Sequence, residues 1–368
     1  MNSSLDPSFW RNRRVLLTGH TGFKGAWLSL WLQALGSRLT GVSLAAPPTK
    51  PSLYELARVG EGMASHVACD VRHASALAHA LAEAHPEVVI HMAAQPLVRH
   101  SFAAPAETYD TNVMGTVNLL DAIRACHSVR AVVVVTSDKC YAPSAMPRAH
   151  SEEDPLGGED PYSSSKAAAE LLTAAYRRSF FSDPDAPRLA TARAGNVIGG
   201  GDFAADRLLP DLFRAAAAGE TVRLRNPTAV RPWQHVLSPL SGYLVLAQAL
   251  HRSPNHARAW NFGPEECDAR TVEWVVGRVS RLLPRGLSWE VDDRGHPPER
   301  PHLTLDSSLS RELLGWAPLT TLEEGLSRTV EWFRAHWAGE DLRAVTLAQI
   351  ESAAPSAQSR RAAEPNRR

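Results

Sequence analysis

Cysteine is scarce in this sequence, which has four in 368 residues. Cys69, Cys126, Cys140 and Cys267 are scattered, without the close pairs that metal sites and small disulfide frameworks use. This usage favours a reduced, cytoplasmic setting and predicts no disulfide framework. The histidines form no ligand-spaced cluster such as H-E-x-x-H, so we expect no metal.

Long apolar runs and an excess of one charge are also missing. No stretch reaches membrane-spanning length, and the opening residues MNSSLDPSFWRNRR lack the apolar segment of a signal peptide. Lys plus Arg and Asp plus Glu both total 39, which points to neither nucleic acid nor an anionic membrane as a partner. We therefore expect a soluble cytoplasmic protein with no nucleic-acid or membrane partner.

Short β-branched runs alternate with helical patterns in the first half of the chain. Runs such as VLLT, PEVVIHMA and AVVVVTS are apolar without alternation, which is typical of parallel strands buried on both faces. We interpret RLATARAGNVIG, residues 188–199, as one further strand. The pattern predicts an α/β fold with a Rossmann-like, doubly wound parallel sheet.

Composition also predicts how the chain is divided. Residues 10–198 are expected to form the Rossmann domain with the catalytic residues, sharing strands with later segments where needed. From about Gly199, glycine and proline interrupt the sequence, which predicts a smaller, loop-rich, mixed substrate-binding lobe over residues 199–338. Residues 339–368 are expected to be a tail that is disordered at its end.

The stretch VLLTGHTGFKG places Gly19, Gly22 and Gly25 between the first strand and the first helix. Glycines there allow a tight turn, and the helix N-terminus offers free N–H groups to a pyrophosphate. The pattern favours a dinucleotide site, with a purely structural turn as the alternative. His20 and Lys24, inside the turn, are candidates for ribose or phosphate contacts, or are solvated.

Ribose recognition is less well defined. The second strand, RLTGVSLAAPP, ends without the acid that binds the NAD ribose and without an adjacent Arg for a 2′-phosphate. This strand alone therefore does not distinguish NAD from NADP. In ACDVR, Asp70 and Val71 are expected beside the adenine, with a helix cap as the alternative for Asp70.

Two short motifs carry groups that can move protons. PYSSSKAAAE places Tyr162 and Lys166 about one helical turn apart, so both side chains emerge on the same face. We expect the ammonium to lower the pKa of the phenol from its reference of ~10 and make it a usable base. TSDKCY, at the end of an apolar run, adds Ser137, Asp138 and Lys139.

Together these motifs resemble the extended short-chain dehydrogenase/reductases, and among them the nucleotide-sugar 4,6-dehydratases. The likeness covers roughly residues 10–340 and is greatest to the dehydratases that act on CDP-glucose. It is carried by GHTGFKGAWLSLWL, HMAAQPLVRHS, TNVMGTVNLLDA, VTSDKCY, DPYSSSKAAAEL, RAGNVIGGGDFAADRLLPD and RPWQHVLSPLSGYL. The resemblance implies NAD as the cofactor and a nucleotide sugar, with CDP-glucose favoured, as the substrate.

The resemblance also implies a role for each matching residue. Tyr162 is implied as the base for the sugar 4-hydroxyl, Lys166 as its pKa-setter and ribose contact, and Ser137 as a donor to the same oxygen. Asp138 is implied as the acid for the departing 6-hydroxyl. The implied cofactor contacts are Gly19, His20, Gly22, Phe23, Lys24, Gly25, Asp70, Val71, Ala93, Asn112, Tyr162 and Lys166. The implied substrate contacts are Gln95, Arg99, Ser137, Asn196, Arg207 and Arg231.

Several of these matches have plainer alternatives. Asn196 and Arg231 are matched to the substrate diphosphate, whose oxygens suit the planar fork of an arginine. The alternatives are a turn residue for Asn196 and a surface ion pair for Arg231. Asp206 and Arg207 are alternatively a solvated pair at a helix start. Asn112 matches a residue that supports the catalytic lysine.

Lys139 departs from the better-known relatives. The dTDP-glucose dehydratases carry glutamate there, which removes the proton from sugar C5, whereas the CDP-glucose dehydratases resemble this chain in having lysine. A base role requires a neutral amine at Lys139. The alternatives are that its charge stabilises an enolate oxygen or holds Asp138 in place, or that it is solvated. The identity of the C5 base therefore stays open.

The implied activity is that of an NAD-dependent lyase, which oxidises C4, eliminates water across C5 and C6, and returns the hydride to C6. Its product is CDP-4-keto-6-deoxyglucose. A 4-epimerase would need no acid for C6, so Asp138 beside Ser137 favours dehydration. A dehydratase of another nucleotide hexose and a non-catalytic NAD-sensing protein are further alternatives. The resemblance also implies a homodimer or dimer of dimers, packed through helices at 106–126 and 161–180, whose apolar residues otherwise face the sheet.

Overall fold

A seven-stranded parallel sheet forms the centre of the molecule, in a computed structural model that describes residues 5–144, 148–295 and 300–353. Its strands lie in the order β3 (Ser65–Ala68), β2 (Arg38–Ser43), β1 (Arg14–Thr18), β4 (Val88–His91), β5 (Ala131–Val135), β6 (Arg188–Ala194) and β10 (Ala259–Phe262). The chain leaves β1 toward β2 on one side and later toward β4 on the other, which creates a topological switch point between β1 and β4. The predicted doubly wound parallel sheet is confirmed.

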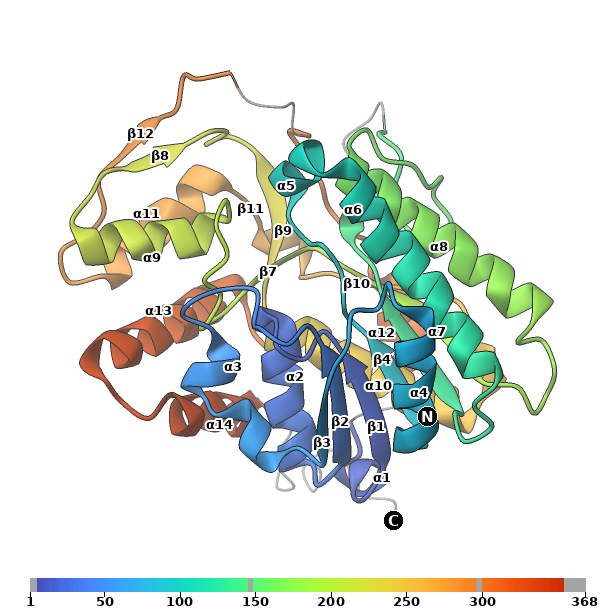
Figure 1. Ribbon diagram of the computed structural model, residues 1–368. Helices are drawn as coiled ribbons and strands as arrows, with labels where there is room; N and C mark the ends of the chain where they lie inside the picture. The colour runs from blue at the N-terminus through green and yellow to red at the C-terminus, as the bar shows by residue number, and fades with distance from the viewer. Residues whose placement is uncertain (1–4, 145–147, 296–299, 354–368) are drawn as a thin grey trace, which may run out of the picture.

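Helices cover both faces of this sheet (Figure 1). One face carries α4 (Ala74–Ala84), α7 (Gly115–Arg124) and α8 (Pro161–Ser179), and the other carries α2 (Phe23–Ala34) and α10 (Leu237–Arg252). Successive residues of a strand point to opposite faces of the sheet. Leu16 therefore packs in the core under α4 and α7, whereas Val15 and Leu17 pack in the core under α2 and α10. The uniformly apolar strands are thereby explained.

Shorter elements complete this part of the chain. The short α-helices are α1 (Pro7–Trp10), α3 (Leu53–Leu56), α5 (Val98–Ala103), α6 (Pro105–Tyr109) and α12 (Ser308–Leu314). The 3₁₀ turns are η1 (Val59–Gly62), η3 (Asp138–Cys140), η4 (Pro254–His256) and η5 (Glu266–Asp268), and η2 (Asp110–Met114) is a π turn between α6 and α7. No helix in the described ranges is long and apolar enough to cross a membrane.

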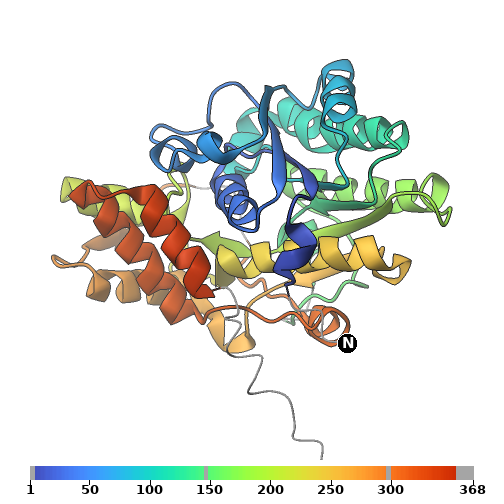
Figure 2. The same ribbon diagram turned by 90° about the horizontal axis from the view of Figure 1, so that it is seen from below.

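A second lobe lies over one end of the sheet. It contains a three-stranded sheet of β7 (Asn196–Ile198), β9 (Val230–His235) and β11 (Ala269–Thr271), and a pair of β8 (Val222–Leu224) and β12 (Trp289–Val291). Its helices are α9 (Leu208–Ala218), α11 (Val272–Leu282) and α13 (Leu322–Ala338). Residues 199–338 also supply β10 of the central sheet, and the expected sharing of strands with later segments allowed for this. They further supply the deeply buried α10, which crosses beneath the central sheet (Figure 2) and which the expectation of a loop-rich lobe did not include.

The single strand expected at 188–199 is two strands. It divides at Gly195, so that β6 stays in the central sheet while β7 pairs with β9 of the second lobe. A Cβ on Gly195 would lie 2.5 Å from Cγ of Pro232, so only glycine allows the chain to pass this closely over β9. The split sends one continuous stretch from the catalytic lobe into the second lobe.

Beyond residue 338 the chain continues as a packed helix. In α14 (Leu342–Ala353), Thr346 accepts a hydrogen bond from the Trp332 indole of α13 at 2.9 Å, and Arg343 donates to Gln33 of α2 at 3.1 Å. The expected disorder at the end of the tail concerns residues 354–368, which lie outside the described part of the chain.

Candidate active site

A cavity of about 1670 Å³ opens at the carboxyl ends of the parallel strands, between the central sheet and the second lobe. The strand ends that line it include Gly19 after β1, Ser43 of β2, Met92 after β4, Val135 of β5 and Ala194 of β6. Ligands of doubly wound sheets bind at this edge, at the switch point between β1 and β4. Among the residues implied as contacts, all except His20 and Asn112 line this cavity.

The glycine turn leaves bare backbone facing the cavity. Gly19 has φ +75°, and a Cβ on it would lie 2.7 Å from the Ala93 nitrogen. A Cβ on Gly25 would lie 2.1 Å from the Gly19 carbonyl oxygen, so both positions require glycine for packing. At Gly22, the N-cap of α2, no side chain caps the helix. The first N–H groups of α2 are therefore open to an anion such as a pyrophosphate.

The far end of the cavity is lined by residues from β2 and β3. Asp70 accepts hydrogen bonds from the backbone and the guanidinium of Arg72, and the Arg72 hydrogen bond holds the pKa of its carboxyl below the usual range. The helix-cap alternative for Asp70 was wrong, since the N-cap of α4 is His73. With Val71 and Ala93 also on the wall, this end fits the adenosine part of a dinucleotide.

The structure contradicts the expected contact of His20 with a ribose or phosphate, and also its solvated alternative. Its imidazole is fully buried behind the turn, with Nε2 2.8 Å from Nδ1 of His66. Gly41 makes room for it, because a Cβ there would lie 2.5 Å from the ring. Burial lowers the pKa of His20 to about 4, so the ring is neutral at pH 7.

The structure also places Asn112 behind the cavity wall instead of against a cofactor. Its Oδ1 accepts from the Gln95 backbone at 2.8 Å, and its Nδ2 donates to the Gln95 carbonyl and to Ser165 Oγ. It lies in the π turn η2, a type of helix irregularity found at functional sites. Asn112 therefore positions Gln95 and Ser165, the residue before Lys166. The resemblance implied that Asn112 supports this lysine, and the contact with Ser165 is compatible with that role.

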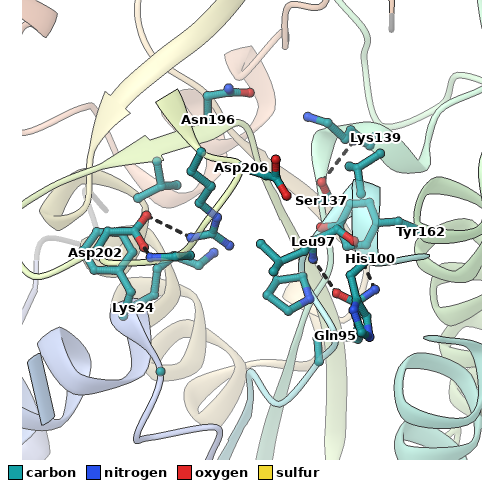
Figure 3. Close-up of a pocket in the computed structure, with 18 of the residues that line it drawn as sticks. Lys24, Gln95, Leu97, His100, Ser137, Lys139, Tyr162, Asn196, Asp202 and Asp206 are labelled. Atoms are coloured by element: carbon teal, nitrogen blue, oxygen red, sulfur yellow. Dashed lines mark hydrogen bonds and ion pairs between the residues drawn. The ribbon is translucent and has the colours of Figure 1, made fainter. Parts of the chain in front are cut away.

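The segment that follows β5 carries three of the implied catalytic residues. Ser137 Oγ accepts from the Lys139 backbone at 3.2 Å and donates to Asp138 Oδ1 at 2.9 Å, which defines the turn η3. Asp138 is buried, and its second oxygen has no hydrogen-bond partner among the residues that the structure describes. Lys139 is 29% exposed, and its Nζ lies 3.7 Å from Asp138 Oδ1. Figure 3 shows Ser137, Lys139 and Tyr162 together on one side of the cavity.

Tyr162 and Lys166 come from the first two turns of α8. Asp160 caps this helix by accepting from the Ser163 backbone, and proline occupies its first position. The expectation that Lys166 lowers the pKa of Tyr162 was wrong for this arrangement: burial dominates and raises that pKa to about 12, although Ser137 acts in the opposite direction. Lys166 Nζ points to the Val135 carbonyl at 3.3 Å, and burial lowers the pKa of Lys166 to about 8.

Lys24 lies on the other side of the cavity, opposite Ser137, Lys139 and Tyr162 (Figure 3). Its Nζ lies 3.4 Å from the Tyr243 hydroxyl of α10 and 5.5 Å from the centre of that ring. Burial lowers the pKa of Lys24 to about 7, and the charges of Lys166 and Arg207 act in the same direction. Lys24 thus places an amine that loses its charge easily on the wall beside the glycine turn.

The second lobe contributes polar groups to the opposite wall. Asn196 Oδ1 is buried there without a hydrogen-bond partner, and Arg231 is buried on β9. Arg231 is therefore not a surface residue, and its Nη1 also donates to the Val230 carbonyl at 2.9 Å. Asp206 and Arg207 do not pair with each other as the solvated alternative required: Arg207 Nη1 lies 3.0 Å from Asp202, and Asp206 lies 3.2 Å from Arg99 of α5.

The sequence analysis missed further arginines on this wall, among them Arg225 and Arg300. Arg225 lies 3.9 Å from Asp206, and Arg300 donates to the Tyr141 carbonyl at 2.7 Å while its Nη1 has no hydrogen-bond partner. Neither belongs to a recognisable motif, because tertiary folding alone brings these loops to the cavity. In the described ranges, no group of three or more His, Cys, Asp or Glu side chains is arranged to hold a metal ion.

Comparison with known proteins agrees with this geometry. A model of the NAD dependent epimerase/dehydratase family matches residues 15–263, and the chain belongs to this family. CDP-glucose 4,6-dehydratase of Salmonella typhimurium is 48% identical over 343 residues, covering 92% of this chain and 95% of that protein. A dTDP-glucose 4,6-dehydratase of Xanthomonas campestris is 27% identical over 86% of this chain and 92% of its own length.

Solved structures share the fold. MoeE5 in complex with UDP-glucuronic acid and NAD has a TM-score of 0.74 and 26% identity, covering 88% of this chain and 99% of that one. The dTDP-glucose 4,6-dehydratase DesIV of Streptomyces venezuelae, with NAD bound, has a TM-score of 0.75 and 23% identity, covering 90% of this chain and 99% of that one.

Proposed function

We propose that this protein is an NAD-dependent lyase that converts CDP-glucose to CDP-4-keto-6-deoxyglucose and water. The observation that carries the proposal is Asp138, a buried carboxyl on the cavity wall with one unpartnered oxygen, next to Ser137 and in the same cavity as Tyr162. A dehydratase needs such a group to protonate the departing 6-hydroxyl, whereas a 4-epimerase does not.

The nucleotide is proposed from the 48% identity to a CDP-glucose 4,6-dehydratase. Purified protein is incubated with CDP-, dTDP-, UDP- and GDP-glucose, and the 4-keto-6-deoxy product is identified by mass spectrometry and NMR. We expect product from CDP-glucose. Product from another nucleotide alone would overturn the choice of base, and a C4 epimer without loss of water would overturn the dehydratase.

The chain's own residues provide the acid–base groups. Bound NAD supplies a hydride acceptor for C4 and a hydride donor for C6, and its oxidised form brings positive charge into the cavity. Tyr162 takes the proton of the 4-hydroxyl as its phenolate, which the positive charges of oxidised NAD and Lys166 would favour against the effect of burial. Ser137 turns its hydroxyl from Asp138 to donate a hydrogen bond to the 4-oxygen when the substrate is bound. Asp138 gives its proton to the departing 6-hydroxyl. The open N–H groups of α2 hold the cofactor's pyrophosphate, and Asn196, Arg207 and Arg231 hold the substrate's diphosphate.

Lys139 is proposed to act at C5. The sequence has only four lysines among its 39 basic residues, and all four, Lys24, Lys50, Lys139 and Lys166, line the cavity. An amine can lose its proton, whereas a guanidinium in a protein does not. The use of lysine in this cavity therefore favours a functional Lys139 over a solvated one. Its contact with Asp138 at 3.7 Å also supports a role in holding that carboxyl.

Replacing Lys139 separates these roles. Lys139→Met is expected to reduce cofactor on binding substrate, yet to lose both product and solvent-deuterium exchange at C5. If Lys139→Met retained exchange at C5 but lost water slowly, the role of Lys139 would instead be to hold the Asp138 carboxyl in place. Near-normal turnover would contradict both roles. Arg148→Met, which removes an exposed cation elsewhere on the cavity wall, serves as the matched control.

We also propose that the protein is a cytoplasmic homodimer. Exposed apolar side chains lie on α5, α6, η2 and α8 and at the C-terminal end of α8, and these elements lie close together in Figure 1. The side chains are those of Phe102, Tyr109, Met114, Leu171 and Phe180. A surface of this kind marks an association site. The cytoplasmic setting is supported by the free thiols of all four cysteines.

Light scattering at micromolar concentration tests the dimer. The wild type is expected to have twice the mass of the chain, and Leu171→Glu is expected to be monomeric because it puts a charge in the middle of this surface. Leu313→Glu changes a leucine of similar exposure on α12 and should leave the dimer intact. A monomeric wild type would contradict the proposal.

A further inference from the structure

The catalytic segment, residues 136–141, is held at both of its ends by one buried network. At its centre is Glu170 of α8, which is 3% exposed and lies one helical turn after Lys166. Its Oε1 accepts a short hydrogen bond from the Thr136 hydroxyl, and its Oε2 accepts from Thr191 and from Arg193 Nη2, both at 2.7 Å. The residue just before Ser137 is therefore tied to the helix that carries Tyr162.

Arg193 of β6 extends the network to the other end of the segment. Its Nη1 donates to the Tyr141 hydroxyl at 2.8 Å, and its guanidinium lies 4.9 Å from the centre of that ring. Tyr141 in turn donates to Asn261 Oδ1 of β10 at 2.6 Å. Ser137, Asp138 and Lys139 thus lie between two anchored residues, Thr136 and Tyr141.

We propose that Glu170 and Arg193 are positioning residues that clamp both ends of the catalytic segment and fix Ser137, Asp138 and Lys139 relative to Tyr162. This inference rests on the proposed function. Neither residue lines the cavity, so neither touches the substrate. A buried ion pair costs much of its attraction in desolvation and often adds little net stability, which favours a role other than stability. Placement errors near 1 Å reduce turnover by roughly 100-fold, so a rigid segment matters for this chemistry.

Substitutions at the two anchors test the clamp without removing the buried charges. Thr136→Val and Tyr141→Phe are each expected to lower kcat by about 10- to 100-fold with little change in KM, because the substrate diphosphate is held by the second lobe. Thr136→Ser keeps the hydroxyl and is expected to restore kcat. Thr173→Val is the matched control. Thr173 is buried on the same helix, but its hydroxyl donates within that helix, to the Ala169 carbonyl at 2.6 Å.

Each outcome decides the inference. Wild-type kcat in either Thr136→Val or Tyr141→Phe would overturn the clamp, because it requires both ends. An equal loss of kcat in Thr173→Val would also overturn it, since any buried hydroxyl would then have the same effect. Circular dichroism and thermal unfolding establish whether each variant is folded. If Thr136→Val does not fold, Tyr141→Phe and the hydroxyl-retaining Thr136→Ser still test the clamp. A wild type that turns over no nucleotide hexose contradicts the proposed function, which is a separate result.

Discussion

Tyr162→Phe is expected to abolish both reduction of the cofactor and formation of the 4-keto product. The phenol oxygen is the proposed acceptor of the 4-hydroxyl proton, and phenylalanine keeps the ring packing while removing that oxygen. Loss of a general base lowers turnover by about 10²- to 10⁴-fold. Stopped-flow absorbance of the reduced cofactor and a product assay measure the two half-reactions.

The matched control for this variant is Tyr176→Phe. Tyr176 lies four turns along the same helix, and its hydroxyl bonds to Asp121 at 3.1 Å, away from the cavity. We expect the control to retain turnover. A Tyr162→Phe enzyme that still reduces the cofactor at the wild-type rate would assign the first proton transfer to another group.

Asp138→Asn is expected to separate the two half-reactions. The amide keeps the shape of the carboxyl and can still accept the hydrogen bond from Ser137, so oxidation at C4 should continue. The amide cannot give a proton to the 6-hydroxyl, so loss of water should fall by about 10²- to 10⁴-fold. Reduced cofactor should therefore accumulate in a single turnover while product lags behind.

The comparison for this variant is Asp183→Asn, which changes an exposed aspartate in the loop before β6. Both proteins should unfold at similar temperatures if Asp138 has no dominant structural role. Equal loss of oxidation and dehydration in folded Asp138→Asn would argue against its assignment as the acid.

Local patterns in the sequence were sufficient to predict the main parallel sheet and to select candidate residues, most of which line the cavity. The glycine spacing, the apolar strands and the Tyr162–Lys166 pair are set by residues close together in the chain. The carboxyl ends of parallel strands meet at one edge, so motifs at strand ends converge there. This is why Ser137, Asp138 and Lys139 were found from one short segment.

Features that depend on distant residues were not predicted in the same way. His20 turns away from the cavity because Gly41 leaves space for its ring and because its Nε2 forms a hydrogen bond with Nδ1 of His66. Neither Gly41 nor His66 is near the glycine turn in sequence. Arg225 and Arg300 lie in loops without a motif. The pKa of Tyr162 is set mainly by burial among residues from the whole site. The spacing between Tyr162 and Lys166 in the sequence gives no information on that burial.

The division of residues 188–199 into two strands has the same origin. The sequence there is mostly apolar and has no proline, so it was interpreted as one strand. Close contact between Gly195 and Pro232 turns the chain and passes it to another sheet. Proline and glycine more than thirty residues apart determine that geometry.

The packing of α14 against α2 has a consequence for how the chain is made. Arg343 and Gln33, which join these two helices, are 310 residues apart in the sequence. During synthesis, the side of α2 that packs against α14 therefore stays uncovered until Arg343 and the rest of α14 have left the ribosome. Contacts of such long range are slow to form and leave apolar surface exposed meanwhile. The nascent protein should depend on chaperones more than a chain whose first domain closes on itself.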